Sequence, residues 1–254
     1  MLLEARNVTK AFGSFKAVDA ASVTLEQGDA TELVAILTQL YSRLQVGPGS
    51  TLVLRPASDA AGALALIEAR QVTVLHGVPT LYHLLMREEA FSPSRVKSLR
   101  TGVIAGSSVD EELVRRVRRW CDVLVAYGLT ETGATVTMTR FTDSDANRLG
   151  SVGRALPGVE VMAVDVVTGV LHGPEAVGEI AVRGANLMRG YLRMPTETAK
   201  VHTSEGFFLT GDLGIIDEDG YVRIIGRRQE TITRGGRQLY PAEIEERLRA
   251  HPAV

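Results

Sequence analysis

The sequence has little of what defines several classes of protein, beginning with cysteine. Among its 254 residues, Cys121 is the single cysteine, so an internal disulfide is excluded. Because Cys121 follows Trp120 in an apolar-flanked segment, we expect it to be a small buried hydrophobe rather than a reactive thiol. These features suit a reducing compartment, and a cytoplasmic location is expected.

Strong net charge and long apolar runs are also lacking. The formal net charge is -2 and the pI is about 6.2, which gives no concentrated basic surface for nucleic acid. No window approaches the roughly 18 apolar residues that a membrane span requires. The first residues do not have the basic-then-apolar pattern of a signal peptide. We therefore expect no nucleic-acid partner and no membrane span.

Lysine is scarce, and none of the lysines belongs to a phosphate-binding loop. There are four, at positions 10, 16, 97 and 200, and none follows a glycine-rich run. The Walker-type loop, in which backbone amides and a lysine hold phosphates, is therefore absent from this sequence.

What is present predicts a folded α/β chain with a β-rich second part. The hydrophobic fraction of 45% is enough for a substantial core. From about residue 50 to 126, β-type runs alternate with helical patterns, which indicates a mostly parallel sheet. The expected strands are Thr51–Leu54, Val72–Leu75, Gly102–Ala105 and Val123–Val125, and the expected helices are 59–70, 79–89 and 109–120. Later strands are expected at Val159–Val166, Gly178–Arg183 and Tyr221–Ile225, with a last helix after Tyr240.

Three polar segments carry the chemistry. The strand Val123–Ala126 runs into Tyr127–Gly133, a loop with two hydroxyls and a carboxylate, and ligands collect where parallel strands end. Taken alone, this could be an ordinary polar loop after a core strand. It is followed about eighty residues later by Thr210–Gly214 and then by Tyr221–Glu230.

Together these segments resemble the acyl-adenylate-forming (AMP-binding) superfamily, and most nearly its fatty-acyl-CoA synthetases. The resemblance covers about residues 31–254 and includes Ser151–Arg154, Gly178–Ile180, Arg189–Tyr191, Arg234–Gly236 and Tyr240–Glu245. It implies a truncated acyl-CoA-synthetase-like fold: a parallel βαβ sheet, a β-rich subdomain and the start of a small α+β C-terminal domain. The implied domains are a partial AMP-binding large domain at 30–226, a hinge at 227–230 and the beginning of the small domain at 231–254.

The resemblance also implies roles for particular residues. Tyr127 lies against adenine with Gly128 beside it, Thr130 bonds the α-phosphate, and Glu131 holds magnesium. Asp212 takes the ribose hydroxyls, Arg227 reaches the ribose or phosphate, and the turn containing Gly106 and Ser107 borders the adenine. The acyl and CoA pocket is assigned to His76, Gly235 and Gly236, and the hinge to Glu230. Plainer interpretations stay open: core packing for Tyr127, a turn former at Asp212, a surface cation at Arg227, a satisfied buried histidine at His76, and a flexible turn at Gly235 and Gly236.

The implied activity is that of an acid-thiol ligase. A carboxylic acid, a fatty acid in the first instance, reacts with ATP and Mg²⁺ to give acyl-AMP, and coenzyme A then accepts the acyl group. Relative to the family, we expect the chain to be incomplete at both ends, without the lysine-containing phosphate loop and the second lysine near the end of the small domain. Losing such donors slows reactions by roughly 10²–10³ each, so we expect impaired catalysis.

Residues 1–29 suggest a different origin. They resemble the first hairpin of an ABC-transporter ATPase, with Phe12 before Gly13. We therefore expect a junction near residues 28–31. Two alternatives to the ligase follow: a non-catalytic module that binds AMP or acyl-AMP, and an ABC-type ATPase subunit. The absence of a Walker loop argues against the ATPase.

Overall fold

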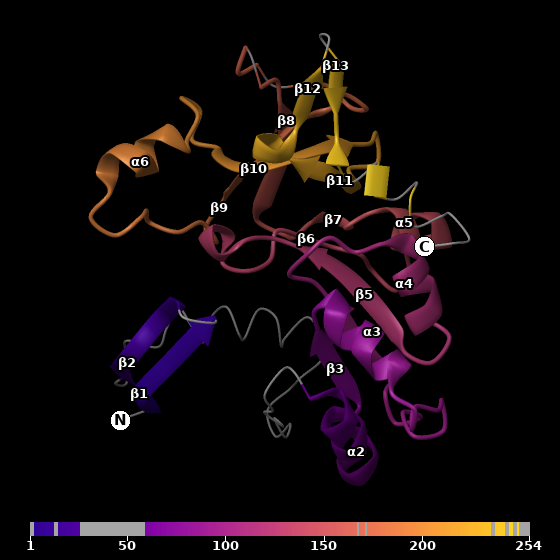
Figure 1. The fold of residues 1–254 in the computed structure, drawn as a ribbon. Helices are drawn as coiled ribbons and strands as arrows, with labels where there is room; N and C mark the ends of the chain where they lie inside the picture. The colour runs from indigo at the N-terminus through magenta and orange to yellow at the C-terminus, as the bar shows by residue number, and fades with distance from the viewer. Residues whose placement is uncertain are drawn as a thin grey trace. The chain divides into compact units, whose positions relative to one another are not determined.

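The computed structural model describes residues 3–12, 15–25, 59–166, 168–170, 172–234, 237–241, 244, 245 and 248 (Figure 1). The chain forms two compact units, residues 1–52 and 53–254. In the first unit, β1 (Leu3–Phe12) pairs antiparallel with β2 (Phe15–Leu25). The first residues thus form a hairpin, and its likeness to an ABC-type ATPase stays a prediction.

A five-stranded mixed sheet begins the second unit. Its order is β3-β4-β5-β6-β7, with β3, β4 and β5 parallel and β6 and β7 added antiparallel. The bounds are β3 Val74–Gly77, β4 Thr101–Ile104, β5 Asp122–Tyr127, β6 Thr137–Met138 and β7 Arg154–Ala155. In register, Gly77 pairs with Ile104, and Ile104 pairs with Val125. The parallel strands therefore end at the same edge, and the α/β prediction is confirmed.

Four helices connect and cover these strands. They are α2 (Ala60–Arg70), α3 (Pro79–Arg87), α4 (Glu111–Val117) and α5 (Asp145–Gly150). The Asp59 and Asp110 side chains cap α2 and α4 by accepting backbone N–H groups, and Pro79 fits the first turn of α3. On α2, Ala60, Leu64 and Ile67 recur at helical spacing and are buried in the core.

The tight contact between β3 and β4 depends on a glycine. A Cβ atom at Gly102 would lie 1.7 Å from the backbone oxygen of Leu75. The Tyr82 hydroxyl of α3 donates to that same oxygen at 2.8 Å. The glycine therefore permits the close packing of two strands and a helix.

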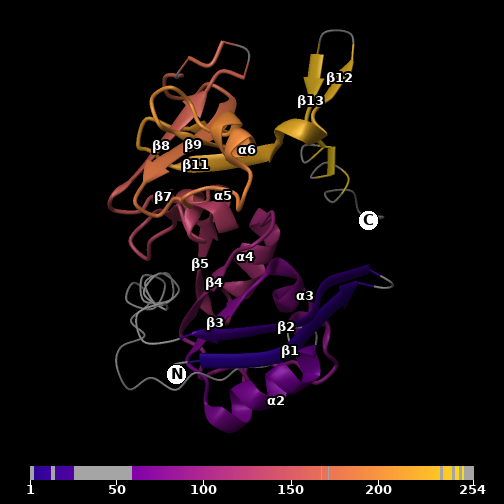
Figure 2. The ribbon, with the colours of Figure 1, turned by 90° about the vertical axis from the view of Figure 1, so that its left-hand side faces the viewer.

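The β-rich part is a four-stranded antiparallel sheet in the order β11-β10-β9-β8, whose strands are all labelled in Figure 1. Figure 2 shows β8, β9 and β11 from another side. Its strands are β8 (Val159–Val164), β9 (Gly178–Gly184), β10 (Phe208–Ile216) and β11 (Val222–Arg227). Hydrogen bonds of 2.8 and 2.9 Å join Val152 and Gly153 to Val222, so this sheet adjoins the residues that directly precede β7. Its core contains Val136, Ile180, Val182 and Val222.

Short elements complete the description. They are the 3₁₀ turns η1 (Thr130–Thr132) and η2 (Arg228–Glu230), the helix α6 (Pro195–Lys200), and the hairpin of β12 (Ile232–Arg234) and β13 (Arg237–Leu239). The predicted strand Thr51–Leu54 lies outside the described residues, as does most of the predicted last helix. Of that helix, residues 241, 244, 245 and 248 are described and are helical.

Candidate nucleotide-binding site

Three segments that the sequence singles out leave the mixed sheet at one edge. His76 lies near the end of β3, Gly106 and Ser107 follow β4, and Tyr127 ends β5. Gly106 has φ of +92°, a conformation that glycine adopts without strain, and both it and Ser107 are exposed. In parallel sheets this edge is where ligands bind, because the connecting loops diverge there.

Tyr127, Asp212 and Arg227 meet in one cluster. The Tyr127 hydroxyl donates to Oδ2 of Asp212 at 2.7 Å, across 85 residues of sequence. Nε of Arg227 lies 2.8 Å from Oδ1 of the same carboxylate. Asp212 is 5% exposed, whereas the Arg227 side chain is 52% exposed. A buried carboxylate therefore joins the edge of the mixed sheet to two strands of the antiparallel sheet.

The electrostatics of the cluster follow from that burial. Desolvation raises the pKa of Asp212 above its ordinary value of 3.8, while the Tyr127 hydrogen bond and the Arg227 charge oppose the rise. The charges of Glu179 and Glu230 add to the rise. Burial first, and then the Asp212 charge, raises the pKa of Tyr127 far above its usual range. Tyr127 therefore stays a neutral donor, and the two partners of Asp212 favour its charged form against the effect of burial.

Thr130 and Glu131 lie on η1, directly beyond β5. Thr130 is exposed, and the backbone N–H of Met188 donates to the Glu131 carbonyl at 2.7 Å. The Tyr191 hydroxyl donates to Oε1 of Glu131 at 3.2 Å, which fixes the side chain. No group of three metal-ligating residues occurs among the described residues. A single carboxylate fits magnesium held jointly with nucleotide phosphates, rather than in a cage made by protein alone.

The remaining predicted site residues differ in their burial and in their contacts. Both ring nitrogens of His76 are buried with no hydrogen-bond partner among the described residues, and burial lowers its pKa. Glu230 is exposed at the end of η2. Gly128, like Tyr127, is partly buried, and a Cβ there would lie 2.4 Å from the Ala134 carbonyl oxygen. Gly235 and Gly236 lie outside the described residues.

Two residues with contacts to the site were not assigned a role from the sequence. Tyr191 holds Glu131, and Glu179 accepts the Gly211 N–H beside Asp212 at 2.9 Å. Both belong to segments that carry the family resemblance. For Glu179, the available signal was a carboxylate directly before the apolar run Ile180–Val182.

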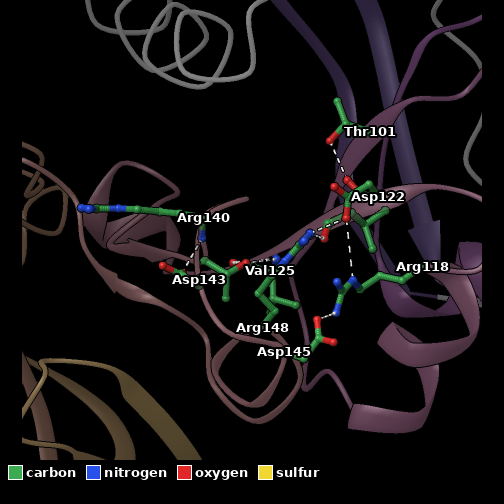
Figure 3. A network of polar contacts seen from close by, with 10 residues as sticks. Thr101, Arg118, Asp122, Val125, Arg140, Asp143, Asp145 and Arg148 are labelled. Atoms are coloured by element: carbon green, nitrogen blue, oxygen red, sulfur yellow. Dashed lines mark hydrogen bonds and ion pairs between the residues drawn. The ribbon is translucent and has the colours of Figure 1, made fainter.

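The other polar network of note lies at the amino end of β5 (Figure 3). Arg148, only 4% exposed, donates to Oδ1 of Asp122 at 2.6 Å and to the Val123 carbonyl at 2.9 Å. Arg118 pairs with Asp145 at 2.8 Å and lies 3.7 Å from Asp122. These contacts fasten α4 and α5 to β5 at the end of the strand opposite Tyr127.

Two further expectations concern the burial of Cys121 and the absence of a membrane span. Cys121 is 2% exposed, and burial, followed by the Asp122 charge, raises its pKa to about 12, so the expected buried hydrophobe is found. No helix in the described part of the chain is long and apolar enough to span a membrane.

This mixed sheet, whose parallel strands end at an edge with an aromatic and a hydroxyl side chain and nearby carboxylates, is an α/β architecture of the kind that binds ligands at that edge. Residues 36–192 match the AMP-binding enzyme family, more than half of the chain, and the chain belongs to that family. The predicted family is thereby confirmed.

Relatives and solved structures agree with this assignment. The chain is 39% identical over 214 residues to YngI of Bacillus subtilis (strain 168), covering 82% of the chain and 39% of YngI. It is 36% identical over 210 residues to the mitochondrial medium-chain acyl-CoA ligase ACSF2 of Mus musculus, covering 81% and 34%. The ATP-bound crystal structure of MatB from Rhodopseudomonas palustris superposes with a TM-score of 0.75 at 35% identity, covering 84% and 42%. The chain thus spans about two fifths of these proteins or less.

Proposed function

We propose that this chain provides the adenylate-binding part of an AMP-forming acyl-CoA ligase. In the proposed reaction, a carboxylate oxygen attacks the α-phosphorus of ATP, acyl-AMP forms and pyrophosphate leaves. The thiol of coenzyme A then attacks the acyl carbon, and AMP leaves. The observation that carries the proposal is the cluster of Tyr127, Asp212 and Arg227 at the carboxyl edge of the sheet.

In this proposal, the cluster binds the adenosine. The Tyr127 hydroxyl is tied to Asp212, so its ring has a fixed plane against which adenine can stack. Asp212 has acceptor capacity beyond its two present partners, because each carboxylate oxygen has two lone pairs for ribose hydroxyls. The half-exposed Arg227 is the cation placed to reach the ribose or phosphate. The exposed turn of Gly106 and Ser107 borders the adenine in this proposal. Gly128 lies next to Tyr127 and lets the Ala134 backbone approach closely.

Thr130 and Glu131 are assigned to the phosphates. The exposed Thr130 hydroxyl can donate to an α-phosphate oxygen. Glu131 would hold Mg²⁺, and the ion would supply positive charge to stabilise the phosphates. Tyr191 occupies one oxygen of Glu131 and so leaves the other for the ion.

The carboxylic acid substrate is proposed only as a chemical class. ACSF2 is named a medium-chain acyl-CoA ligase, which supports a fatty acid as the first substrate to test. His76 is proposed for the acyl pocket, because its buried ring nitrogens have no protein partner. Gly235 and Gly236 keep their proposed place near coenzyme A, and Glu230 its place as the hinge.

We propose that the chain by itself binds adenylates with little turnover. Its four lysines lie outside glycine-rich runs, so it offers no lysine loop for the β- and γ-phosphates. The ligase activity is therefore proposed for a protein of the relatives' length. The cytoplasm is the proposed location, supported by the buried Cys121. ACSF2 is named mitochondrial, so the location of a fluorescent fusion of this chain would distinguish the cytoplasm from mitochondria.

The test is thermal unfolding with and without a non-hydrolysable acyl-adenylate analogue. At about 100 times its Kd, such a ligand stabilises the native state by about 2.7 kcal/mol, or roughly 5–10 °C here. Asp212→Asn should abolish most of the shift. Asp143→Asn is the matched control, since Asp143 also accepts a tyrosine hydroxyl, that of Tyr221 at 2.9 Å, and lies beside an arginine. A cooperative transition that no adenylate shifts would refute the proposal.

A further inference from the structure

Strand β10 bulges at the residues that precede and include Asp212. In its ladder with β9, Leu209 pairs with Ala181 and Leu213 with Glu179, so Thr210–Asp212 stand opposite Ile180 alone. Gly211 adopts φ of +75° within the bulge. A bulge redirects side chains and leaves backbone groups without ladder partners. Those groups need other partners when they are buried.

Two side chains supply these partners. The Thr210 hydroxyl donates to the Ile180 carbonyl at 2.8 Å and accepts the Asp212 N–H at 3.1 Å. The Gly211 N–H donates to Oε1 of Glu179 at 2.9 Å. Glu179 is only 4% exposed, so a buried carboxylate from β9 closes the bulge.

The second oxygen of Glu179 holds Arg228. Nη1 of Arg228 lies 2.9 Å from Oε2, and Nη2 donates to the Val166 carbonyl at 3.5 Å. A buried carboxylate is stable when it is paired and hydrogen-bonded, and both conditions are met here. Arg228 directly follows Arg227, the ion partner of Asp212. One carboxylate therefore fastens both chain segments that bring Asp212 and Arg227 together.

We propose that Glu179 is a positioning residue for ribose recognition, fixing the β10 bulge through Gly211 and the start of η2 through Arg228 so that Asp212 faces the ribose hydroxyls. This inference rests on the proposed function, in which Asp212 binds the ribose. Glu179 itself touches no nucleotide. Arg228 pairs with Glu179. The charges of Glu179 and Glu230 raise the pKa of Asp212, and Tyr127 and Arg227 oppose that rise.

The first experiment compares AMP with 2′,3′-dideoxy-AMP by calorimetry on the whole chain. The Kd of 2′,3′-dideoxy-AMP divided by the Kd of AMP reports recognition of the ribose hydroxyls. Glu179→Asp keeps the charge but is one methylene too short for Gly211, so the ratio should fall about tenfold through weaker AMP binding. Glu179→Gln keeps the reach and one acceptor for Gly211, but its NH2 group faces Arg228 in place of an oxygen, so the ratio should fall as well.

The matched control is Glu160→Asp. Glu160 pairs with Arg183 at 2.7 Å on the same sheet, but it is exposed and does not contact the bulge. Its ratio should equal that of the parent chain. The inference is overturned if either Glu179→Asp or Glu179→Gln leaves the ratio unchanged.

Hydrogen exchange without ligand separates this inference from the proposed function. Peptides covering 209–213 and 227–231 should exchange faster in Glu179→Asp and at the parent rate in Glu160→Asp, because Glu179 contacts the bulge and Glu160 does not. If the parent chain fails to bind AMP but this pattern appears, the positioning stands and the ribose role falls. Unchanged exchange in Glu179→Asp overturns the positioning.

Discussion

Replacing Tyr127 by phenylalanine tests the central hydrogen bond of the site. The change keeps the aromatic ring and removes the hydroxyl that donates to Asp212 at 2.7 Å. A hydrogen bond to a charged group contributes about 1.5–3 kcal/mol. For a chain of this size, Tyr127→Phe should therefore lower Tm by about 3–12 °C near neutral pH.

The effect should depend on pH in a defined direction. Burial raises the pKa of Asp212 above 3.8, so this group favours the folded state below its unfolded pKa and loses that contribution as the pH rises through the folded pKa. Without the Tyr127 donor, the folded pKa of Asp212 rises further. The loss of stability in Tyr127→Phe should be largest above that pKa and shrink as Asp212 becomes protonated.

Urea unfolding from pH 4 to 8 measures this difference, and AMP titration is run beside it. Tyr221→Phe is the control, because Tyr221 is 8% exposed and its hydroxyl donates to Asp143 at 2.9 Å. It should lose stability without changing AMP affinity, whereas Tyr127→Phe should weaken AMP binding as Asp212 loses a partner. A stability difference between Tyr127→Phe and the parent that is the same at every pH would refute the reasoning.

Three further changes and one control have defined outcomes. Tyr191→Phe should weaken Mn²⁺-dependent nucleotide binding several-fold but not metal-free AMP binding, as measured by calorimetry, because its hydroxyl orients Glu131. Arg148→Met should lower the free energy of unfolding in urea by about 2 kcal/mol, since this 4%-exposed guanidinium holds a carboxylate at 2.6 Å. Arg115→Met, on an exposed pair, should cost less than about 0.5 kcal/mol. Gly102→Ala should destabilise by about 3 kcal/mol or more in the same assay, because its Cβ would overlap a carbonyl oxygen of β3.

The helices and parallel strands could be predicted because their signals are local. Helix 59–70 was expected from spacing and is found at Ala60–Arg70, capped by Asp59. Boundaries were less accurate, since they depend on contacts. The strand expected at Val72–Leu75 is found at Val74–Gly77, where its register with β4 places it. The helix expected at 109–120 ends at Val117 and continues only as turns.

The candidate site was predictable only in part. Tyr127 and Asp212 could be named from their segments, but their hydrogen bond requires two sheets to adjoin, which no local pattern specifies. Glu179 could not be recognised because its role depends on a bulge in a different strand. Tyr191 contacts Glu131 across 60 residues, and residue type alone does not reveal that approach.

Residue types alone would even give two equivalent candidate sites. Tyr221 donates to Asp143, and Arg154 lies 4.0 Å from that carboxylate, so a second tyrosine, aspartate and arginine come together. There, however, the guanidinium stacks 4.8 Å above the tyrosine ring, and the backbone N–H of Arg140 also donates to Asp143, at 2.6 Å. That ring face is therefore covered, whereas Tyr127 ends a parallel strand at the edge where ligands bind. Position in the fold, rather than residue type, favours Asp212 as the proposed ribose ligand, and the contrast between Asp212→Asn and Asp143→Asn tests that assignment.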